Sequence, residues 1–99
     1  MEIERSRTNR GFEILEFKDR YNVDCSIQKS SLADDEAIWF GINDANPKIM
    51  ASKTEKGGTG WVSYEIPDDV LLSTRMHLTR EQVKELLPIL TKFAETGDL

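Results

Sequence analysis

The chain has 99 residues, of which 38% are hydrophobic and 31% charged, enough for one domain with a modest core. Its single cysteine, Cys25, excludes an internal disulfide and a multi-cysteine zinc site, and no apolar run approaches the roughly 20 residues of a membrane-spanning helix. The net charge of −5 comes entirely from residues 33–99, so general binding of duplex DNA is not expected. A lone thiol without a secretory signal predicts a cytoplasmic protein.

The N-terminal residues 1–10 are highly charged and carry little apolar periodicity. We therefore expect a flexible N-terminal arm, followed by a single domain over residues 11–99. Residues 12–17 predict a strand, in which a change of apolar parity after Ile14 indicates a bulge or a bend. Residues 23–28 alternate strictly between apolar and polar side chains, which predicts a second strand paired with the first as a hairpin.

The middle of the chain predicts three more strands. Residues 37–42 are apolar on both parities, which is typical of a central strand covered on both faces. A short helical turn is expected over residues 48–52, followed by a mobile glycine-rich loop at residues 57–60. Alternating apolar residues then predict strands over residues 61–66 and 72–78.

The C-terminal segment carries the clearest local signals of the chain. Thr79 and Gln82 have the spacing of a capping box, and Gly97 predicts the end of the helix. Pro88 lies inside the segment, and we expect it to kink the helix. One apolar stripe runs along this helix, formed by Val83, Leu86, Leu87, Leu90, Phe93 and Ala94.

Together these elements predict an α+β fold, with a small antiparallel sheet of four to five strands and one C-terminal amphipathic helix packed on it. The helix stripe is expected to pack on Phe12, Ile14, Ile27, Phe40 and Met76. A sheet covered on one side leaves an edge or a face exposed, which predicts a homo-oligomer, with a dimer as the expected form.

Polar side chains follow one parity on two predicted strands, and they suggest a binding site. Lys29 adds charge at the strand edge, a helix N-terminus lies nearby, and an arginine fork suits an anion such as phosphate. The alternative is an ordinary solvated face of a one-sided sheet. The candidate ligand-binding residues are Gln28, Lys29, Ser30, Trp39, Arg75 and His77, with Trp39 available to stack on a flat group.

No catalytic, metal or cofactor site is predicted. His77 is the only histidine, and Cys25 has the apolar parity of its strand, as expected for a buried small side chain. The acidic run at residues 34–36 lacks the spacing of a calcium loop. The glycines at residues 57–60 lack the ending of a phosphate loop. We therefore expect a protein that is not an enzyme.

The segments Cys25–Ser31, Ala37–Gly41 and Met76–Val83 resemble a family of small bacteriophage and prophage proteins without an assigned function. The resemblance spans about residues 11–98 and implies expression in the cytoplasm of a host bacterium. Small accessory phage proteins often resemble counter-defence factors. The predicted cluster of Gln28, Lys29, Arg75 and His77 favours one such role, the sequestration of an anionic, nucleotide-like immune signal. The alternative is an inhibitor that binds a host defence protein through a surface patch. Neither duplex nucleic acid nor a membrane is expected as a partner.

Overall fold

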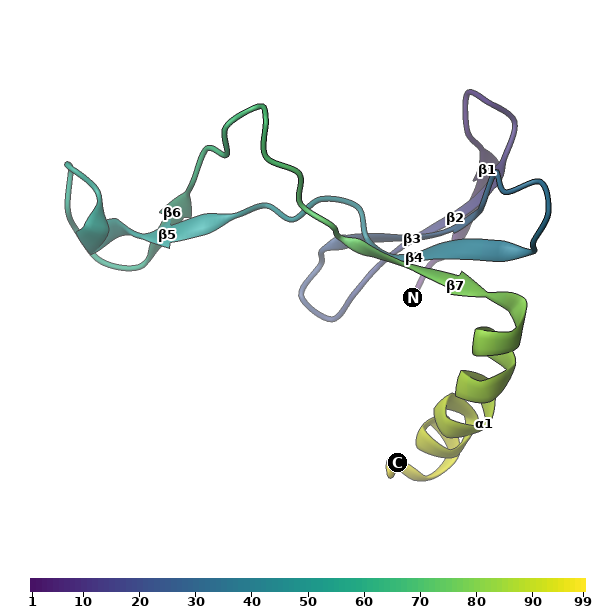
Figure 1. Ribbon diagram of the computed structural model, residues 1–99. Helices are drawn as coiled ribbons and strands as arrows, with labels where there is room; N and C mark the ends of the chain where they lie inside the picture. The colour runs from purple at the N-terminus through teal and green to yellow at the C-terminus, as the bar shows by residue number, and fades with distance from the viewer. The chain divides into compact units, whose positions relative to one another are not determined.

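The computed structural model describes residues 1–99 and contains a five-stranded antiparallel sheet, a separate two-stranded ribbon and one C-terminal helix (Figure 1). In the five-stranded sheet the order is β1-β2-β3-β4-β7, so β1 and β7 form its edges. The strands are β1 (Glu4–Arg7), β2 (Glu13–Lys18), β3 (Asp24–Lys29), β4 (Ala37–Ile42) and β7 (Arg75–Thr79). With the helix α1 (Arg80–Thr96), this sheet confirms the predicted α+β class.

The N-terminal segment differs from the expected flexible arm, because it contains the edge strand β1. Its register places Arg5 opposite Leu15 and Arg7 opposite Glu13. Both arginines also approach the Glu13 carboxylate at 3.8 Å. Cross-strand pairs of opposite charge favour strand pairing even where the sequence lacks the apolar alternation that predicts a strand. The low hydrophobicity of the segment therefore did not prevent it from joining the sheet.

The register divides the sheet into a polar and an apolar face. The polar face carries Ser26, Gln28, Trp39, Arg75 and His77. The apolar face carries Leu15, Phe17, Cys25, Ile27, Ile38, Phe40, Ile42, Met76 and Leu78. On the apolar face the rings of Phe17 and Phe40 meet edge to face, with centroids 6.5 Å apart.

The expected bulge in the first predicted strand is absent from β2. Ile14 pairs with Gln28 and Leu15 with Ile27, without a break in the register. Ile14 therefore lies on the polar face and Leu15 on the apolar face. The apparent slip in parity arises because β2 presents an apolar side chain to each side of the sheet.

Residues 44–74 form a second compact unit, where the sequence predicted a single domain. In this unit β5 (Lys48–Met50) pairs with β6 (Trp61–Ser63), and a short 3-10 turn (Ala51–Lys53) follows β5. The residues after Ser63 were expected to continue the strand, but they are irregular. β5 and β6 form a separate two-stranded sheet and do not join the five-stranded one.

The helix α1 begins and ends where the sequence predicted. The Thr79 hydroxyl accepts a hydrogen bond from the Gln82 amide at 3.2 Å, and the Thr79 amide donates to Gln82 Oε1 at 2.9 Å. Gly97 ends the helix in the left-handed conformation, with φ of 80°. Pro88 lies within one continuous helix. No loop separates β7 from α1, because Thr79 is both the last residue of β7 and the helix cap.

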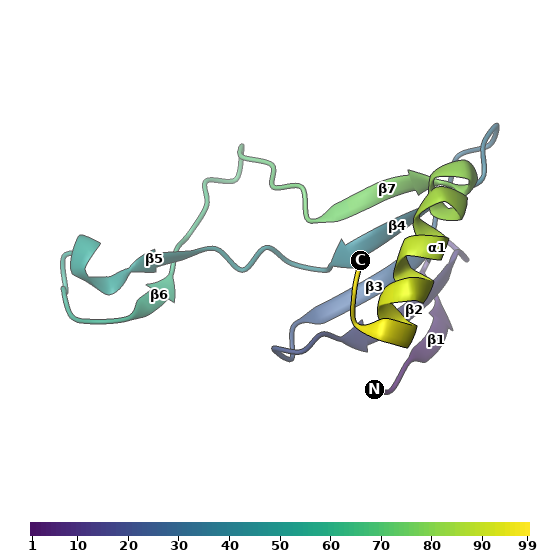
Figure 2. The same cartoon turned by 90° about the horizontal axis from the view of Figure 1, so that it is seen from below.

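The predicted packing of the helix stripe on the sheet is only partly present. Val83 and Leu87 line a groove of about 330 Å³ together with Ile38 and Leu78, which places α1 over the apolar face. Figure 1 shows the helix inclined away from the sheet beyond this contact, and Figure 2 shows it crossing the strands. No residue of α1 is buried.

Two of the five expected packing partners lie on the wrong side of the sheet for α1. Ile14 is on the polar face, and Phe12 precedes it by two residues and shares its side. Ile27, Phe40 and Met76 are on the apolar face as expected, but Met76 remains 57% exposed. The parity of β2 was misassigned, so the sequence placed the wrong side chains under the helix.

No helix in this structure is both long enough and apolar enough to cross a lipid bilayer.

Candidate functional site

The polar face gathers its side chains because three neighbouring strands are in antiparallel register. One cross-strand row runs Gln28, Trp39, His77, and the next runs Ser26, Gly41, Arg75. Gly41 has no side chain to occupy the middle of its row. The long Arg75 side chain therefore extends from β7 across β4 to reach β3.

Arg75 is half-buried and makes its contacts with neutral groups. Its Nη1 donates to Gln28 Oε1 at 2.9 Å and to the Ser26 hydroxyl at 3.5 Å. Its guanidinium carbon also lies 5.8 Å from the centroid of the Trp39 ring. A guanidinium has five N–H donors, so these contacts leave most of its donor capacity unused.

His77 completes the group, because its imidazole ring stacks on the indole ring of Trp39. The imidazole lies parallel to Trp39, with ring centroids 3.9 Å apart and an interplanar angle of 8°. His77 Nε2 is 2.9 Å from the Ser30 hydroxyl. Residues from β3, β4 and β7 thus form one contiguous set, which we name the Arg75 cluster: Gln28, Ser30, Trp39, Arg75 and His77.

The charge of the Arg75 cluster has no carboxylate partner within the chain. The ion pairs of the protein involve other bases: Arg5, Arg7, Lys18, Arg80 and Lys84. Glu16 follows Ser26 in the same cross-strand row, but no ion pair connects Glu16 to Arg75. In a chain of net charge −5, an uncompensated and half-buried guanidinium is the feature best suited to an anion.

A cavity of about 490 Å³ adjoins the Arg75 cluster and shares Gln28 and Trp39 with it. The segment between β1 and β2 closes its other side with Thr8, Asn9, Arg10 and Phe12. Arg10 lies 5.7 Å from the Phe12 ring centroid and, like Arg75, takes part in no ion pair. No acidic side chain lines this cavity.

The sequence interpretation missed the contribution of Arg10 and Phe12. It assigned Arg10 to a flexible arm and Phe12 to the packing under the helix. The signal that could have found them is the pairing of β1 with β2, because the turn of that hairpin returns residues 8–12 to the edge of the polar face.

Of the six predicted site residues, the structure brings five together and separates Lys29. The pairing of Lys29 with Ile38 places it on the apolar face, where it lines the groove beside α1. The expected help from the helix N-terminus is also reduced, because the capping box occupies an amide of the first turn.

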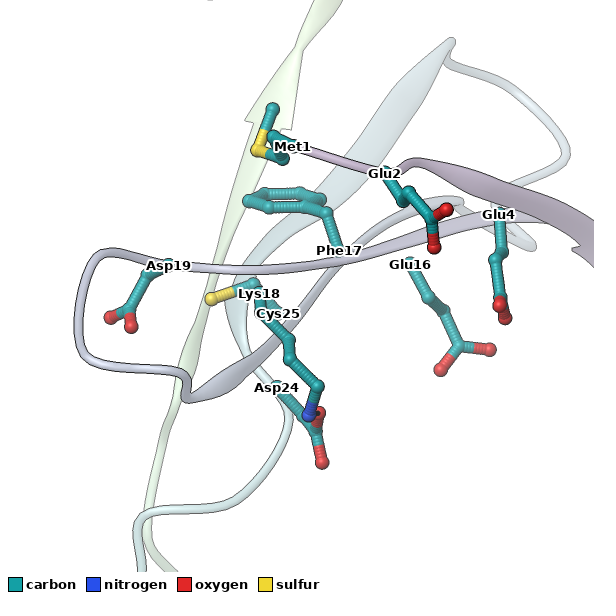
Figure 3. Close-up of a pocket in the computed structure, with 9 residues that line it drawn as sticks. All are labelled: Met1, Glu2, Glu4, Glu16, Phe17, Lys18, Asp19, Asp24 and Cys25. Carbon is teal, nitrogen blue, oxygen red and sulfur yellow. Dashed lines mark hydrogen bonds and ion pairs between the residues drawn. The ribbon is translucent and has the colours of Figure 1, made fainter.

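Another cavity, of about 510 Å³, lies at the other end of the strands and has an acidic lining (Figure 3). Its lining includes Glu2, Glu4, Glu16, Asp19 and Asp24. Its one basic side chain, Lys18, donates to Asp24 at 2.6 Å, and this pairing raises the pKa of the lysine. No three histidine, cysteine or acidic side chains in the chain are arranged to hold a metal ion. This cavity is therefore unsuited to an anion.

Comparison of the chain with protein-family models, curated proteins and solved structures finds no match in any of the three.

Proposed function

We propose that this chain binds an anionic, nucleotide-like ligand on the polar face of its sheet and sequesters it without chemical change. The observation that carries the proposal is the half-buried Arg75 guanidinium, which contacts Gln28, Ser26 and Trp39 but no carboxylate. Following the phage resemblance, we propose that the protein acts in the cytoplasm of a host bacterium as a counter-defence factor.

The chemistry around Arg75 supports a ligand with both a phosphate and a flat ring. Free N–H donors of Arg75 suit a phosphate or another planar anion, since such charge-assisted hydrogen bonds are about twice as strong as neutral ones. Phe12 and Trp39 line the adjoining cavity, whose volume of about 490 Å³ lies within the usual range for small-molecule sites. Arg10 adds a second cation at the cavity wall.

Binding without chemical change is favoured over hydrolysis, although the cluster contains a serine–histidine contact. A catalytic serine must be accessible, and its histidine is normally oriented by a third group. Ser30 is only 6% exposed, and its hydroxyl already accepts a bond from the Leu32 amide at 3.3 Å. No carboxylate hydrogen-bonds to His77.

Calorimetry with a panel of mononucleotides, cyclic nucleotides and cyclic dinucleotides tests the proposal. We expect Arg75→Ala to weaken binding by at least about tenfold, because a hydrogen bond to a charged group contributes about 1.5–3 kcal/mol. Lys29→Ala is the matched control, since it removes a cation on the opposite face and should leave affinity unchanged. Recovery of the nucleotide intact after release separates sequestration from hydrolysis.

Two results would overturn this assignment. Absence of binding across the panel removes the proposed function. Tight binding that survives both Arg75→Ala and His77→Ala places the site elsewhere on the chain.

A second candidate function, direct inhibition of a host defence protein, is favoured by the unit of residues 44–74. This unit leaves large apolar side chains in solvent, among them Trp61 at 66% and Leu71 at 90% exposure. Exposed aromatic and aliphatic side chains of this kind are typical of protein-binding patches. Loss of a captured host protein on Trp61→Ser, with nucleotide affinity unchanged, would favour this function.

A further inference from the structure

The apolar stripe of α1 is wider than the part of it that lines the groove against the sheet. Val83 and Leu87 face the groove against the sheet, together with Ile38 and Leu78. Four residues of α1 line this groove: Arg80, Val83, Lys84 and Leu87. At 3.6 residues per turn, the mean direction of Leu86, Ile89 and Phe93 is rotated by roughly 130° about the helix axis from the mean direction of those four residues. We name these three residues the outer seam.

The outer seam has no partner within the unit formed by residues 1–43 and 75–99. Leu86 is 39% exposed, Ile89 48% and Phe93 55%. The helix also lacks freedom to turn this side toward its own sheet, because no loop separates it from β7. The Arg80 amide donates to the Glu36 carbonyl at 2.9 Å, which further fixes the first turn. A covering partner must therefore come from outside the unit that contains the sheet and α1.

The charges beside the outer seam are arranged for a second copy of the same helix. Glu85 and Lys92 are seven residues apart and flank the seam on one side. When two such helices pack antiparallel, residues at equivalent flanking positions face each other across the seam. Glu85 of each helix would then meet Lys92 of the other, twice in one symmetric interface. Glu85 forms no ion pair within its own protomer.

We propose that two copies of this chain form a twofold-symmetric dimer through an antiparallel pair of α1 helices. In this dimer Leu86 packs beside the Ile89 of the second copy, and two Glu85–Lys92 pairs fix the register. A register shifted by one heptad would place the Lys92 side chains of the two copies against each other. Repulsion between these like charges disfavours the shifted register and favours the one with two Glu85–Lys92 pairs. The interface contains only a 17-residue helix from each protomer, and we expect a dimer that dissociates in the micromolar range.

Sedimentation equilibrium from low to high micromolar concentration, with charge-exchange variants of the full chain, tests the proposal. Glu85→Lys alone and Lys92→Glu alone each place like charges together at both pairs. Each should raise the dissociation constant of the dimer by about tenfold or more. The double variant Glu85→Lys/Lys92→Glu restores opposite charges and should restore the dimer.

The matched control is Glu95→Lys, which makes the same charge change on the far side of α1 and should leave association unchanged. Phe93→Glu should give a monomer, and unchanged far-UV circular dichroism would show that this monomer remains folded. A wild-type monomer at every concentration would overturn the proposal. So would a dimer that is weakened by neither single charge change, or one that the double variant fails to restore.

Discussion

At the residue scale, the position of Arg75 depends on the side chains that the fold places beside it. Gly41 leaves the row open between β7 and β3, and Gln28 supplies a neutral oxygen at 2.9 Å. The alternation of polar residues on two strands was visible in the sequence, and the site hypothesis depended on the two strands sharing a sheet face, as the register shows for Gln28, Arg75 and His77. That β4 separates these strands, with Trp39 and Gly41 between them, could not be predicted, because strand order is a tertiary property.

Gln28→Glu tests whether the uncompensated charge of Arg75 is the source of affinity. The substitution keeps the shape of the side chain but places a carboxylate oxygen beside Arg75 Nη1. We expect nucleotide affinity to fall by at least about tenfold, because the ligand must displace an internal partner of the same charge. The melting temperature should hold or rise. Calorimetry and a thermal melt measure the two effects.

The neutral variant Gln28→Met provides the control for this substitution. It removes the amide without adding charge, so it should weaken binding less than Gln28→Glu does. Equal affinity for Gln28→Glu and the wild type would mean that the ligand is bound somewhere other than at Arg75.

A second residue-scale prediction concerns pH and the pair formed by Lys18 and Asp24. The hydrogen bond and the charge of Asp24 raise the lysine pKa above its ordinary value of 10.5. Because the pKa is raised in the folded state, the stabilising contribution of the pair is fully present below the ordinary pKa of 10.5. It is lost as the pH rises through the higher pKa of the folded state. Both side chains are more than half exposed to solvent, so the contribution of the pair to stability is small. NMR titration of the Lys18 ammonium should show a pKa that falls in Asp24→Asn.

At the element scale, α1 shows which properties of a helix are local. Its start, cap and end were predicted correctly, because the capping box and the terminal glycine act within a few residues. Its packing was not predicted, because the angle between helix and sheet depends on the direct connection at Thr79 and on the register of β2. The apolar stripe correctly predicts an amphipathic helix but does not specify which surface covers it.

Thr79→Ala tests how strongly the cap stabilises α1. The hydroxyl accepts from the Gln82 amide, and its removal should lower the free energy of unfolding by about 1 kcal/mol. Urea denaturation followed by circular dichroism measures this change. Thr91→Ala is the control, because Thr91 is an exposed threonine within the helix and is not a capping residue. If Thr79→Ala and Thr91→Ala lower the free energy of unfolding by the same amount, the cap contributes little to stability.

At the scale of the whole molecule, the chain combines two units that the sequence did not separate. The strand predicted over residues 61–66 was assigned to the same domain as the other strands. Composition does not change sharply at either boundary, and the decisive fact is that β5 and β6 pair with each other. The antiparallel pairing of β4 with β7 brings the two ends of the inserted unit together.

This pairing predicts that the five-stranded sheet and α1 fold without the inserted unit. Gly41 and Arg75 are the last pair of this register, and continuing it by two residues in a shortened chain would place Asn43 opposite Ser73. Replacing residues 44–72 by Asn-Gly would therefore connect β4 and β7 through a two-residue hairpin turn of a favoured type. Asn43 is retained, because its Oδ1 accepts from the buried Ser26 hydroxyl at 2.6 Å.

The shortened chain should unfold cooperatively and bind nucleotide with the affinity of the full chain, because every residue of the Arg75 cluster lies outside the deleted segment. Closing a loop of 2 residues instead of 29 also lowers the entropic cost by about 2 kcal/mol, since each doubling of loop length costs about 0.6 kcal/mol. Urea denaturation and calorimetry measure stability and binding. A shortened chain that is unfolded would show that the sheet depends on the inserted unit. A folded chain without affinity would instead assign part of the ligand site to residues 44–72.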